Sequence, residues 1–167
     1  MALRATIEAR STRGTRLIPA GEFYLGPYMN VLEADELVTG ITFPNWPQGH
    51  ITLFREVARR PGDFALAGIV GALGVEGGRI TRAGLAWFGM GPTPVRAKAA
   101  EQALLGQSPD AIDPQAVAER AVADTAPFDD QHASAEYRRT VGKRIFARTL
   151  REALGIGEVA GARTTSK

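Results

Sequence analysis

The chain of 167 residues contains no cysteine. Disulfides, thiolate metal ligands, iron–sulfur clusters held by this chain and a cysteine nucleophile are therefore all excluded. The absence of cysteine also fits a cytoplasmic protein. Only two histidines are present, His50 and His132, and they lie far apart in the sequence. A metal site would need several carboxylates as well, and no spacing of acidic residues indicates one.

The chain also has little excess charge and no long apolar run. Lys and Arg total 20 against 18 Asp and Glu, so the net charge is +2, and no block of like charges concentrates it. This balance argues against nucleic-acid binding. The longest apolar segment, residues 64–75, is shorter than the ~20 residues that a membrane span needs. No signal peptide is predicted from the stretch MALRATIEARSTRG.

Several catalytic motifs are missing from the sequence. It has no Gly-x-Ser-x-Gly elbow, no phosphate-binding loop and no His-Glu-x-x-His motif. The glycines of GALGVEGG and GMGPTP lack the strand–GxGxxG–helix arrangement of a dinucleotide fold, and GALGVEGG is typical of a tight hairpin.

What is present is the composition of an ordinary globular protein, with 44% hydrophobic and 23% charged residues. The pattern changes near Ile112, from short runs rich in β-branched and aromatic residues to alanine-rich helical patterns. Strands followed by helices are typical of an α+β fold. The predicted strands cover residues 4–10, 15–20, 35–44, 51–59, 64–75 and 79–88.

Short connections define how these strands pair. The first two strands form a hairpin, and the last three form an antiparallel meander because RPGD and EGG are too short for a crossover. The segment AGEFYLGPYMNVL predicts a loop or a single helical turn. The run FALAGIVGALGV is nearly continuous in small apolar residues, which indicates either burial on both faces or helices packed closely against its glycines.

Three helices are predicted after the strands. Thr93-Pro94 and Asp113-Pro114 each have the pattern of an N-cap followed by proline at the first helical position. Ser134 is the predicted cap of the longest helix, residues 135–154, which Gly155 ends. The predicted fold is therefore α+β: a three-stranded antiparallel sheet packed against a three-helix bundle. The predicted strands of residues 4–10, 15–20 and 35–44 precede it, and residues 156–167 are predicted to form a disordered tail.

The stretch FDDQH, residues 128–132, has two interpretations. Two carboxylates and a histidine are suited to acid–base chemistry. A solvated turn ahead of a helix is the other reading, because aspartate is favoured at the positive end of a helix.

Four fragments in order carry a resemblance to a known family. They are GTRLIPAGEFYLGPYMNVLEADELVTGITFP, FREVARRPGDFALAGI, GMGPTPVRAKAAEQALLG and DDQHASAEYRRTVGKRIFARTL. Together they resemble the flavin subunit of the molybdenum hydroxylases, which include carbon monoxide dehydrogenase and xanthine dehydrogenase. The resemblance implies two units. Residues 1–45 would be the closing strands of a second α+β subdomain, the middle FAD-binding one, and residues 46–155 would form the C-terminal domain of the flavoprotein.

The resemblance also implies cofactor-binding residues. Val38 matches an apolar residue that packs on the isoalloxazine, and Phe64 matches a position beside the same ring system. Arg55 matches a polar position near the flavin edge, and Asp63 matches the charged pattern at the start of the following loop. Simple core packing is the alternative for Phe64. The preceding arginines, Arg59 and Arg60, are either cations near the flavin or solvated charges beside a turn. The SAEYRR residues are expected to be structural, with Tyr137 packing on the sheet and bonding a loop carbonyl.

One feature of the family is missing from the chain. Its two glycine-rich loops, of the AGGT and TIGG types, wrap the FAD pyrophosphate, and neither occurs in this sequence. Since backbone amides supply that binding, we expect this polypeptide alone to bind FAD weakly or not at all. Met1 would then be an internal start or a fragment boundary, or a second chain would supply the missing half. Strands 4–10 and 15–20 would be unpaired edges open to such a partner.

The function implied by the resemblance is electron transfer. Electrons from molybdopterin and iron–sulfur clusters on partner subunits, a large and a small one, would pass through FAD to an external acceptor. No catalytic residue is expected in this chain, and neither nucleic acid nor membrane is an expected partner. One alternative is a flavin-free binding or scaffold module that docks to other subunits. A second is a small-ligand enzyme that uses a vacant cleft between the sheet and the helices.

Overall fold

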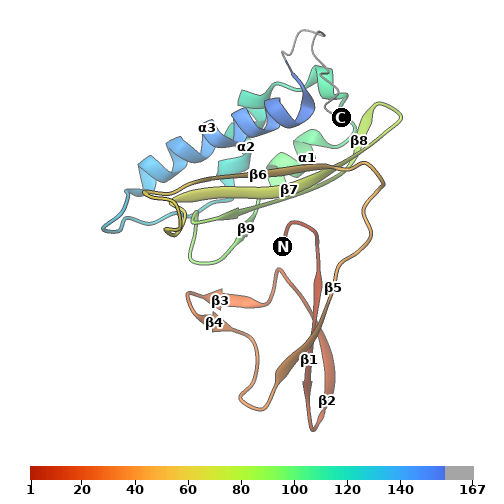
Figure 1. Ribbon diagram of the computed structural model, residues 1–167, viewed down its shortest axis with the longest axis vertical. Coiled ribbons are helices and arrows are strands. Elements are labelled where there is room, and N and C mark those ends of the chain that lie inside the picture. The colour runs from red at the N-terminus through yellow and green to blue at the C-terminus, as the bar shows by residue number, and fades with distance from the viewer. Residues whose placement is uncertain (157–167) are drawn as a thin grey trace, which may run out of the picture.

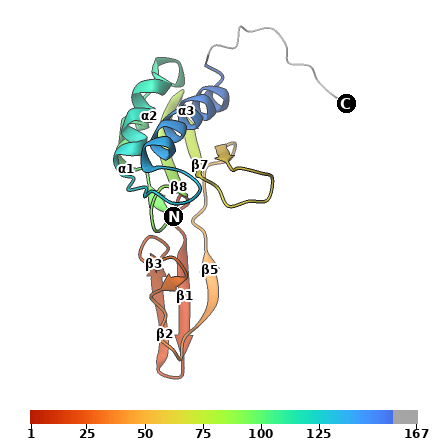
Figure 2. The ribbon, with the colours of Figure 1, turned by 90° about the vertical axis from the view of Figure 1, so that its left-hand side faces the viewer.

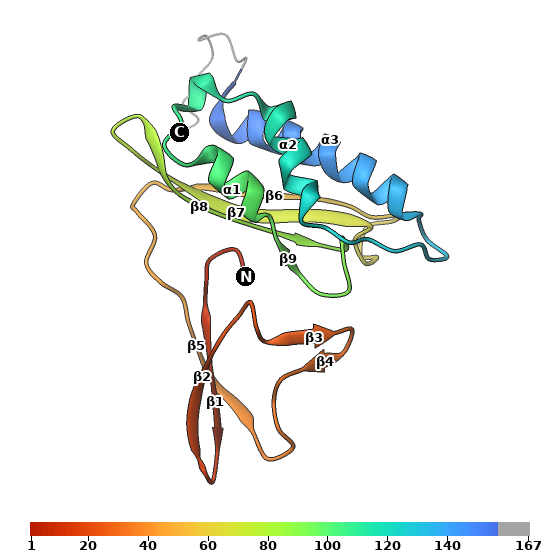
Figure 3. The ribbon, with the colours of Figure 1, turned by 180° about the vertical axis from the view of Figure 1, so that it is seen from behind.

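The computed structural model describes residues 1–156 and shows two β-sheets arranged along the long axis of the molecule (Figure 1). The upper, four-stranded antiparallel sheet has the order β6-β7-β8-β9 and carries the helices of residues 98–154 on one face. The lower, three-stranded sheet has the order β2-β1-β5, and a small β3-β4 hairpin lies beside it (Figure 3). This arrangement confirms the predicted α+β class.

The upper sheet contains the predicted antiparallel meander. Its three long strands are β6 (Ile51–Val57), β7 (Ala67–Glu76) and β8 (Arg79–Phe88). Gly77 and Gly78 form the turn between β7 and β8, and their positive φ angles of 57° and 74° suit glycine. β7 begins three residues later than predicted, so Phe64 lies outside the strand.

One predicted helix start is wrong. Thr93-Pro94 does not cap a helix, because the chain first adds a short fourth strand, β9 (Val95–Arg96), to the edge of β8. Helix α1 (Lys98–Leu104) begins only after Ala97, whose N–H donates to the carbonyl of Leu85. Sheet pairing therefore overrides the local capping pattern.

The other two helices begin where the sequence predicted. The Asp113 carboxylate accepts from the Gln115 N–H at the start of α2 (Pro114–Ala123), and the Ser134 hydroxyl accepts from the Tyr137 N–H at the start of α3 (Ala135–Leu154). A short 3₁₀ helix, η1 (Pro109–Ala111), precedes α2. Gly155 ends α3 in the left-handed conformation, with φ of 67°. The predicted tail, residues 156–167, lies outside the described residues apart from Ile156.

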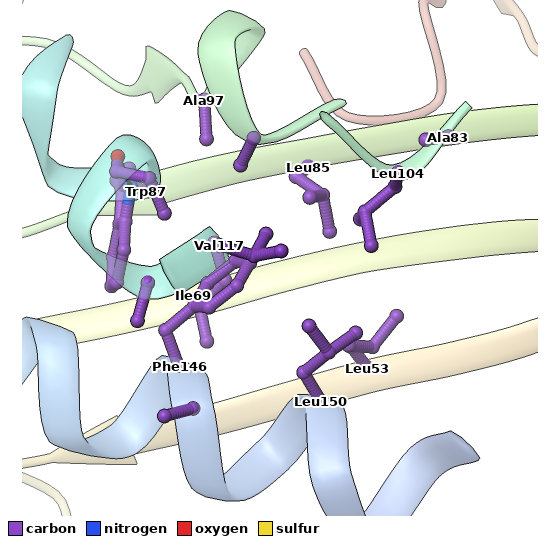
Figure 4. Close-up of a cluster of buried hydrophobic side chains, with 14 of the residues drawn as sticks. Leu53, Ile69, Ala83, Leu85, Trp87, Ala97, Leu104, Val117, Phe146 and Leu150 are labelled. Carbon is purple, nitrogen blue, oxygen red and sulfur yellow. Dashed lines mark hydrogen bonds between the residues drawn. The ribbon is translucent and has the colours of Figure 1, made fainter. Parts of the chain in front are cut away.

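The main core fills the space between the upper sheet and the helices (Figure 4). Trp87 is fully buried in this core, packs on Phe146 with ring centroids 5.9 Å apart and donates its indole N–H to the Ala121 carbonyl at 2.7 Å. The predicted vacant cleft between sheet and helices is therefore occupied by side chains. The largest fully buried ones are Trp87, Phe146, Ile69, Leu73, Ile80, Leu85, Met90, Leu104 and Leu150.

The small residues of β7 are explained by burial on both faces, which holds from Ala67 to Gly74 except at Val70. On the face away from the helices, the ring of Phe88 lies over Gly68, 2.2 Å from where a Cβ atom would be. Trp46 covers Gly84 of the adjacent strand in the same way, and the Arg82 guanidinium lies 4.1 Å from the Trp46 ring centroid. Larger side chains at these glycines would displace the rings.

The lower sheet corrects two predictions. β1 (Thr6–Ser11) pairs with β2 (Gly14–Pro19) as predicted, but it also pairs with β5 (Leu37–Thr42) and is the central strand, not an unpaired edge. The segment AGEFYLGPYMNVL, residues 20–32, was predicted as a loop or a single helical turn but contains a short hairpin. This hairpin consists of β3 (Tyr24–Gly26) and β4 (Met29–Asn30), and Tyr28 closes it with a φ of 58°.

Candidate functional site

The loop between β6 and β7, residues 58–66, carries two of the predicted site residues. The Asp63 N–H donates to the Arg60 carbonyl at 3.1 Å, and Gly62 has a φ of 89°, so RPGD forms the predicted turn. Phe64 follows this turn and is 91% exposed. Its ring is therefore not packed in the core of the described chain, which leaves it available to a ligand or a partner.

Arg138 of α3 holds the end of this loop. Its buried guanidinium donates to the Leu66 carbonyl at 2.6 Å, to the Gly89 carbonyl at 3.1 Å and to the Asp130 carboxylate at 2.7 Å. The sequence pointed instead to Tyr137, which is 47% exposed. Arg138, and not the predicted Tyr137, thus bonds the loop carbonyl, so the SAEYRR segment is structural through Arg138.

The FDDQH segment is a capped turn. Asp129 accepts from the Ala135 N–H, and Asp130 accepts from the N–H groups of His132 and Ala133. These backbone bonds, with a smaller contribution from Arg138, lower the pKa of Asp130 to about 2. The two carboxylates therefore act in local structure, as the turn interpretation predicted.

His132 connects this turn to the β6–β7 loop. Its Nδ1 lies 3.3 Å from Nη1 of Arg59, a residue of that loop. Arg59 thus contacts a neighbouring segment of the same domain, and Arg138 and His132 together join the two loops.

Arg55 projects from β6 toward the helices. Its strand neighbours show the alternation, since Leu53 is buried in the core and Phe54 is exposed on the opposite face. The Arg55 guanidinium pairs with the Glu152 carboxylate of α3, and its buried Nε has no hydrogen-bond partner. The cation is therefore held at the edge of the sheet, because β6 is an edge strand.

Val38 lies in the lower sheet, opposite Ala9 of β1, and is 43% exposed. Its face of the sheet is covered along β1 by Phe23, Val31 and Leu32, whereas the part along β5 stays open, where Ile41 is 54% exposed. Val38 thus belongs to a different sheet from Arg55, Asp63 and Phe64. Figure 2 shows that β5 and the β6–β7 loop nevertheless lie on the same side of the ribbon.

Two family models match the chain in sequence order. Residues 1–46 match the FAD binding domain in molybdopterin dehydrogenase, and residues 52–153 match the CO dehydrogenase flavoprotein C-terminal domain. The chain belongs to the CO dehydrogenase flavoprotein family. This finding confirms the resemblance drawn from the four sequence fragments.

Named members of this family are similar over most of the chain. The nicotine 6-hydroxylase medium subunit of Paenarthrobacter nicotinovorans is 34% identical, over 98% of this chain and 55% of its own length. The carbon monoxide dehydrogenase medium chain of Hydrogenophaga pseudoflava is 29% identical, over 92% and 53%. The chain therefore spans about half the length of the curated relatives it matches.

Solved structures of the family have the same fold. Carbon monoxide dehydrogenase from Hydrogenophaga pseudoflava superposes with a TM-score of 0.85 at 32% identity, covering 92% of this chain and 54% of that chain. Quinoline 2-oxidoreductase from Pseudomonas putida 86 gives a TM-score of 0.80 at 30% identity, with coverage of 92% and 53%.

This chain also has exposed apolar side chains on the face of the upper sheet that points away from the helices. Phe54 and Phe88 stack there with ring centroids 6.1 Å apart, beside Val70, and Phe54 is 63% exposed. Sequence patterning did not single out this pair, although the alternation of β6 places Phe54 opposite the core.

A cavity of about 630 Å³ opens between the two sheets, and its lining includes the charged residues Arg4, Arg96, Lys98, Glu22 and Asp124. Arg96 is not a free cation in this cavity, because it pairs with the buried carboxylate of Glu101. Glu101 also accepts from the Leu85 N–H at 2.9 Å and lies 3.6 Å from Arg4, so it joins the lower and upper parts of the chain.

Residues 1–156 contain neither a metal-ion cluster nor a membrane-spanning helix. No group of three or more acidic or histidine side chains is arranged to hold a metal ion. No helix in this range is long and apolar enough to cross a membrane.

Proposed function

We propose that the chain is the C-terminal part of the flavin subunit of a molybdenum hydroxylase. In this role it helps to pass electrons from iron–sulfur clusters through FAD to an external acceptor. The observation that carries the proposal is the pair of family matches, residues 1–46 and 52–153, in the order expected for such a subunit. Residues 1–45 are then the end of the middle FAD-binding subdomain, and residues 46–155 are the C-terminal domain.

The proposed partners are a molybdopterin-binding large subunit and an iron–sulfur small subunit. Relatives of the chain are named medium subunits or medium chains. The glycine-rich half of the FAD site comes from a polypeptide outside this sequence. Uncovered apolar side chains of β5 and of the segment after it are consistent with this missing half, and they are Leu37, Val38, Ile41 and Phe43.

The proposed contacts with FAD suit the chemistry of the cofactor. The exposed apolar side chains of Val38 and Phe64 are suited to pack on the isoalloxazine and exclude water from it. The guanidinium of Arg55 is a fixed cation for the polar edge of the ring, and Asp63 supplies negative charge at the loop end. FAD, once bound, supplies the electron-carrying chemistry, while these residues bind, orient and shield it.

The first test is purification of the chain with and without a polypeptide that carries the glycine-rich loops. We expect flavin absorbance only in the combined preparation, because the pyrophosphate donors lie outside this chain. Isolated chain saturated with FAD would contradict the incomplete site. A combined preparation that forms a stable complex without flavin would contradict the proposed function.

The second test uses a pair of variants in the combined preparation. Val38→Asp places a charge on the proposed flavin face, so we expect FAD content to fall at least tenfold. Leu17→Asp is the matched control because Leu17 is exposed on the same sheet, opposite Glu8, and thus on the other face from Val38. Equal loss of FAD in both variants would argue against a specific contact at Val38.

A flavin-free scaffold module is the second candidate function. The stacked Phe54–Phe88 surface favours it, because an exposed aromatic pair can dock a partner protein without any cofactor. A colourless but stable complex in the first test would support this function. A cytoplasmic location is also proposed, and cell fractionation with an antibody to the chain would test it.

A further inference from the structure

Glu152 occupies a position that helix stability does not explain. It lies in the last turn of α3, where the helix macrodipole favours cations over carboxylates. Its i–4 neighbour is Arg148, and the order arginine-then-glutamate is the less favourable one for such a pair. A residue that departs from two local preferences is a candidate for a role outside its own helix.

The Glu152 carboxylate is shared between two arginines. Its Oε1 accepts from Nε of Arg148 at 2.7 Å, and its Oε2 accepts from Nη2 of Arg55 on β6. Arg148 lies on the outer surface of α3 with its side chain 68% exposed. Arg55 is 97 residues away in the sequence, so the second contact connects the helix to the edge of the sheet.

The contact with Glu152 determines the orientation of the Arg55 guanidinium. The strand on either side is fixed, since Leu53 is buried near Leu150 (Figure 4) and Arg55 itself pairs with Ile69 of β7. Its Nε is buried without a partner, and Glu152 is the one side chain within residues 1–156 that accepts a hydrogen bond from its guanidinium. Without the carboxylate, the guanidinium would rotate along the open edge of β6.

We propose that Glu152 is a positioning residue, which fixes the Arg55 guanidinium at the edge of β6 and partly neutralises the charge that Arg55 presents to FAD. This inference rests on the proposed function, in which Arg55 lies beside the flavin. A cation near the ring favours the reduced, more negative form of the cofactor. Glu152 weakens that preference, so it makes the midpoint potential of the bound FAD more negative.

The test is Glu152→Gln in the FAD-loaded protein, purified with the polypeptide that completes the flavin site. Glutamine keeps the shape and removes the charge, so the midpoint potential becomes more positive. A surface ion pair of this kind changes the relative affinity for reduced and oxidised FAD by about fivefold. For a two-electron couple that is about 20 mV, since tenfold equals about 30 mV.

A matched control distinguishes the effect of losing the Arg55–Glu152 contact from the effect of changing the net charge of the protein. Glu119 of α2 pairs with Lys143 on the outer side of the bundle, so Glu119→Gln makes the same change in net charge away from Arg55. We expect no shift in midpoint potential for this control. A shift equal to that of Glu152→Gln would overturn the proposal, because it would show a long-range effect of charge.

A double-variant cycle tests whether Glu152 acts through Arg55. We expect Arg55→Gln to make the potential more negative and to abolish the effect of Glu152→Gln. A shift that persists in the Arg55→Gln background, or no shift in folded Glu152→Gln protein, would refute the positioning role. Thermal unfolding of each variant checks the fold. Wild-type protein without FAD would instead refute the proposed function itself, so the two failures are distinguishable.

Discussion

Replacing Arg138 with methionine tests the inference that one buried guanidinium holds the β6–β7 loop. Methionine has a similar length and keeps the apolar contacts of the side chain, but it removes every hydrogen-bond donor. The Leu66 and Gly89 carbonyls lose a charged donor, at 2.6 and 3.1 Å respectively, and the Asp130 carboxylate loses one at 2.7 Å.

The expected loss in the free energy of unfolding depends on how many hydrogen bonds each acceptor keeps without Arg138. A hydrogen bond to a charged group contributes about 1.5–3 kcal/mol, and a buried acceptor left without a partner costs about 1–3 kcal/mol. Asp130 keeps two backbone N–H bonds, so its loss is small. The bond to Leu66 is buried and is the larger loss. We therefore expect Arg138→Met to reduce the free energy of unfolding by about 3 kcal/mol, a large share of the ~5–15 kcal/mol typical of a domain.

Urea denaturation followed by tryptophan fluorescence measures this change, because Trp87 lies in the core next to α3. Arg139→Met is the matched control. Arg139 is the exposed neighbour on the same helix, and a surface substitution changes stability by no more than about 0.5 kcal/mol. Equal midpoints for wild type and Arg138→Met would refute the argument, since they would show that the three bonds contribute nothing net.

Two further predictions concern packing and acid sensitivity. Gly84→Ala would place a Cβ 2.2 Å from the Ala2 carbonyl oxygen, so we expect a loss of about 1–3 kcal/mol in urea denaturation. Gly40→Ala meets only an ordinary 3.8 Å contact and should be tolerated. The pKa of Asp130 is lowered to about 2, so its contribution to stability is present above its ordinary pKa of 3.8 and is lost as the pH falls toward 2. Denaturation from pH 5 to pH 2 should show a weaker pH dependence for Asp130→Asn than for wild type, and equal curves would contradict this.

Local signals explain which parts of the fold could be predicted. The caps Asp113 and Ser134 and the stop Gly155 act within a few residues, and the structure has the helix ends that they predict. The long strands of the meander were also predicted, because the alternation of apolar residues and the sequence of a turn are local properties. Thr93-Pro94 misled for the same reason: the cap pattern is local, whereas β9 forms because β8 offers an edge with which to pair.

The candidate site was only partly predictable, because its support is non-local. The resemblance indicated Val38, Arg55, Asp63 and Phe64, and their contact with FAD stays a prediction. The contact of Arg138 with Leu66 spans 72 residues, and that of Arg55 with Glu152 spans 97. No spacing in the sequence reports such pairs. The closest available signal was the position of Glu152 in the last turn of α3, where a carboxylate is unfavourable.

The two sheets differ in how completely they bury their apolar side chains, and this difference bears on function. The upper sheet has a closed core on its helical face and leaves the Phe54–Phe88 patch, with Val70 beside it, exposed on the other. The lower sheet buries Ile7, Ala9 and Ile18 along two strands but leaves β5 uncovered. An uncovered apolar strand marks a surface that binds a ligand or another polypeptide, and under the proposed function the missing half of the flavin site covers it. Because Val38 lies on that open strand, whatever completes the lower sheet also encloses the proposed flavin contact.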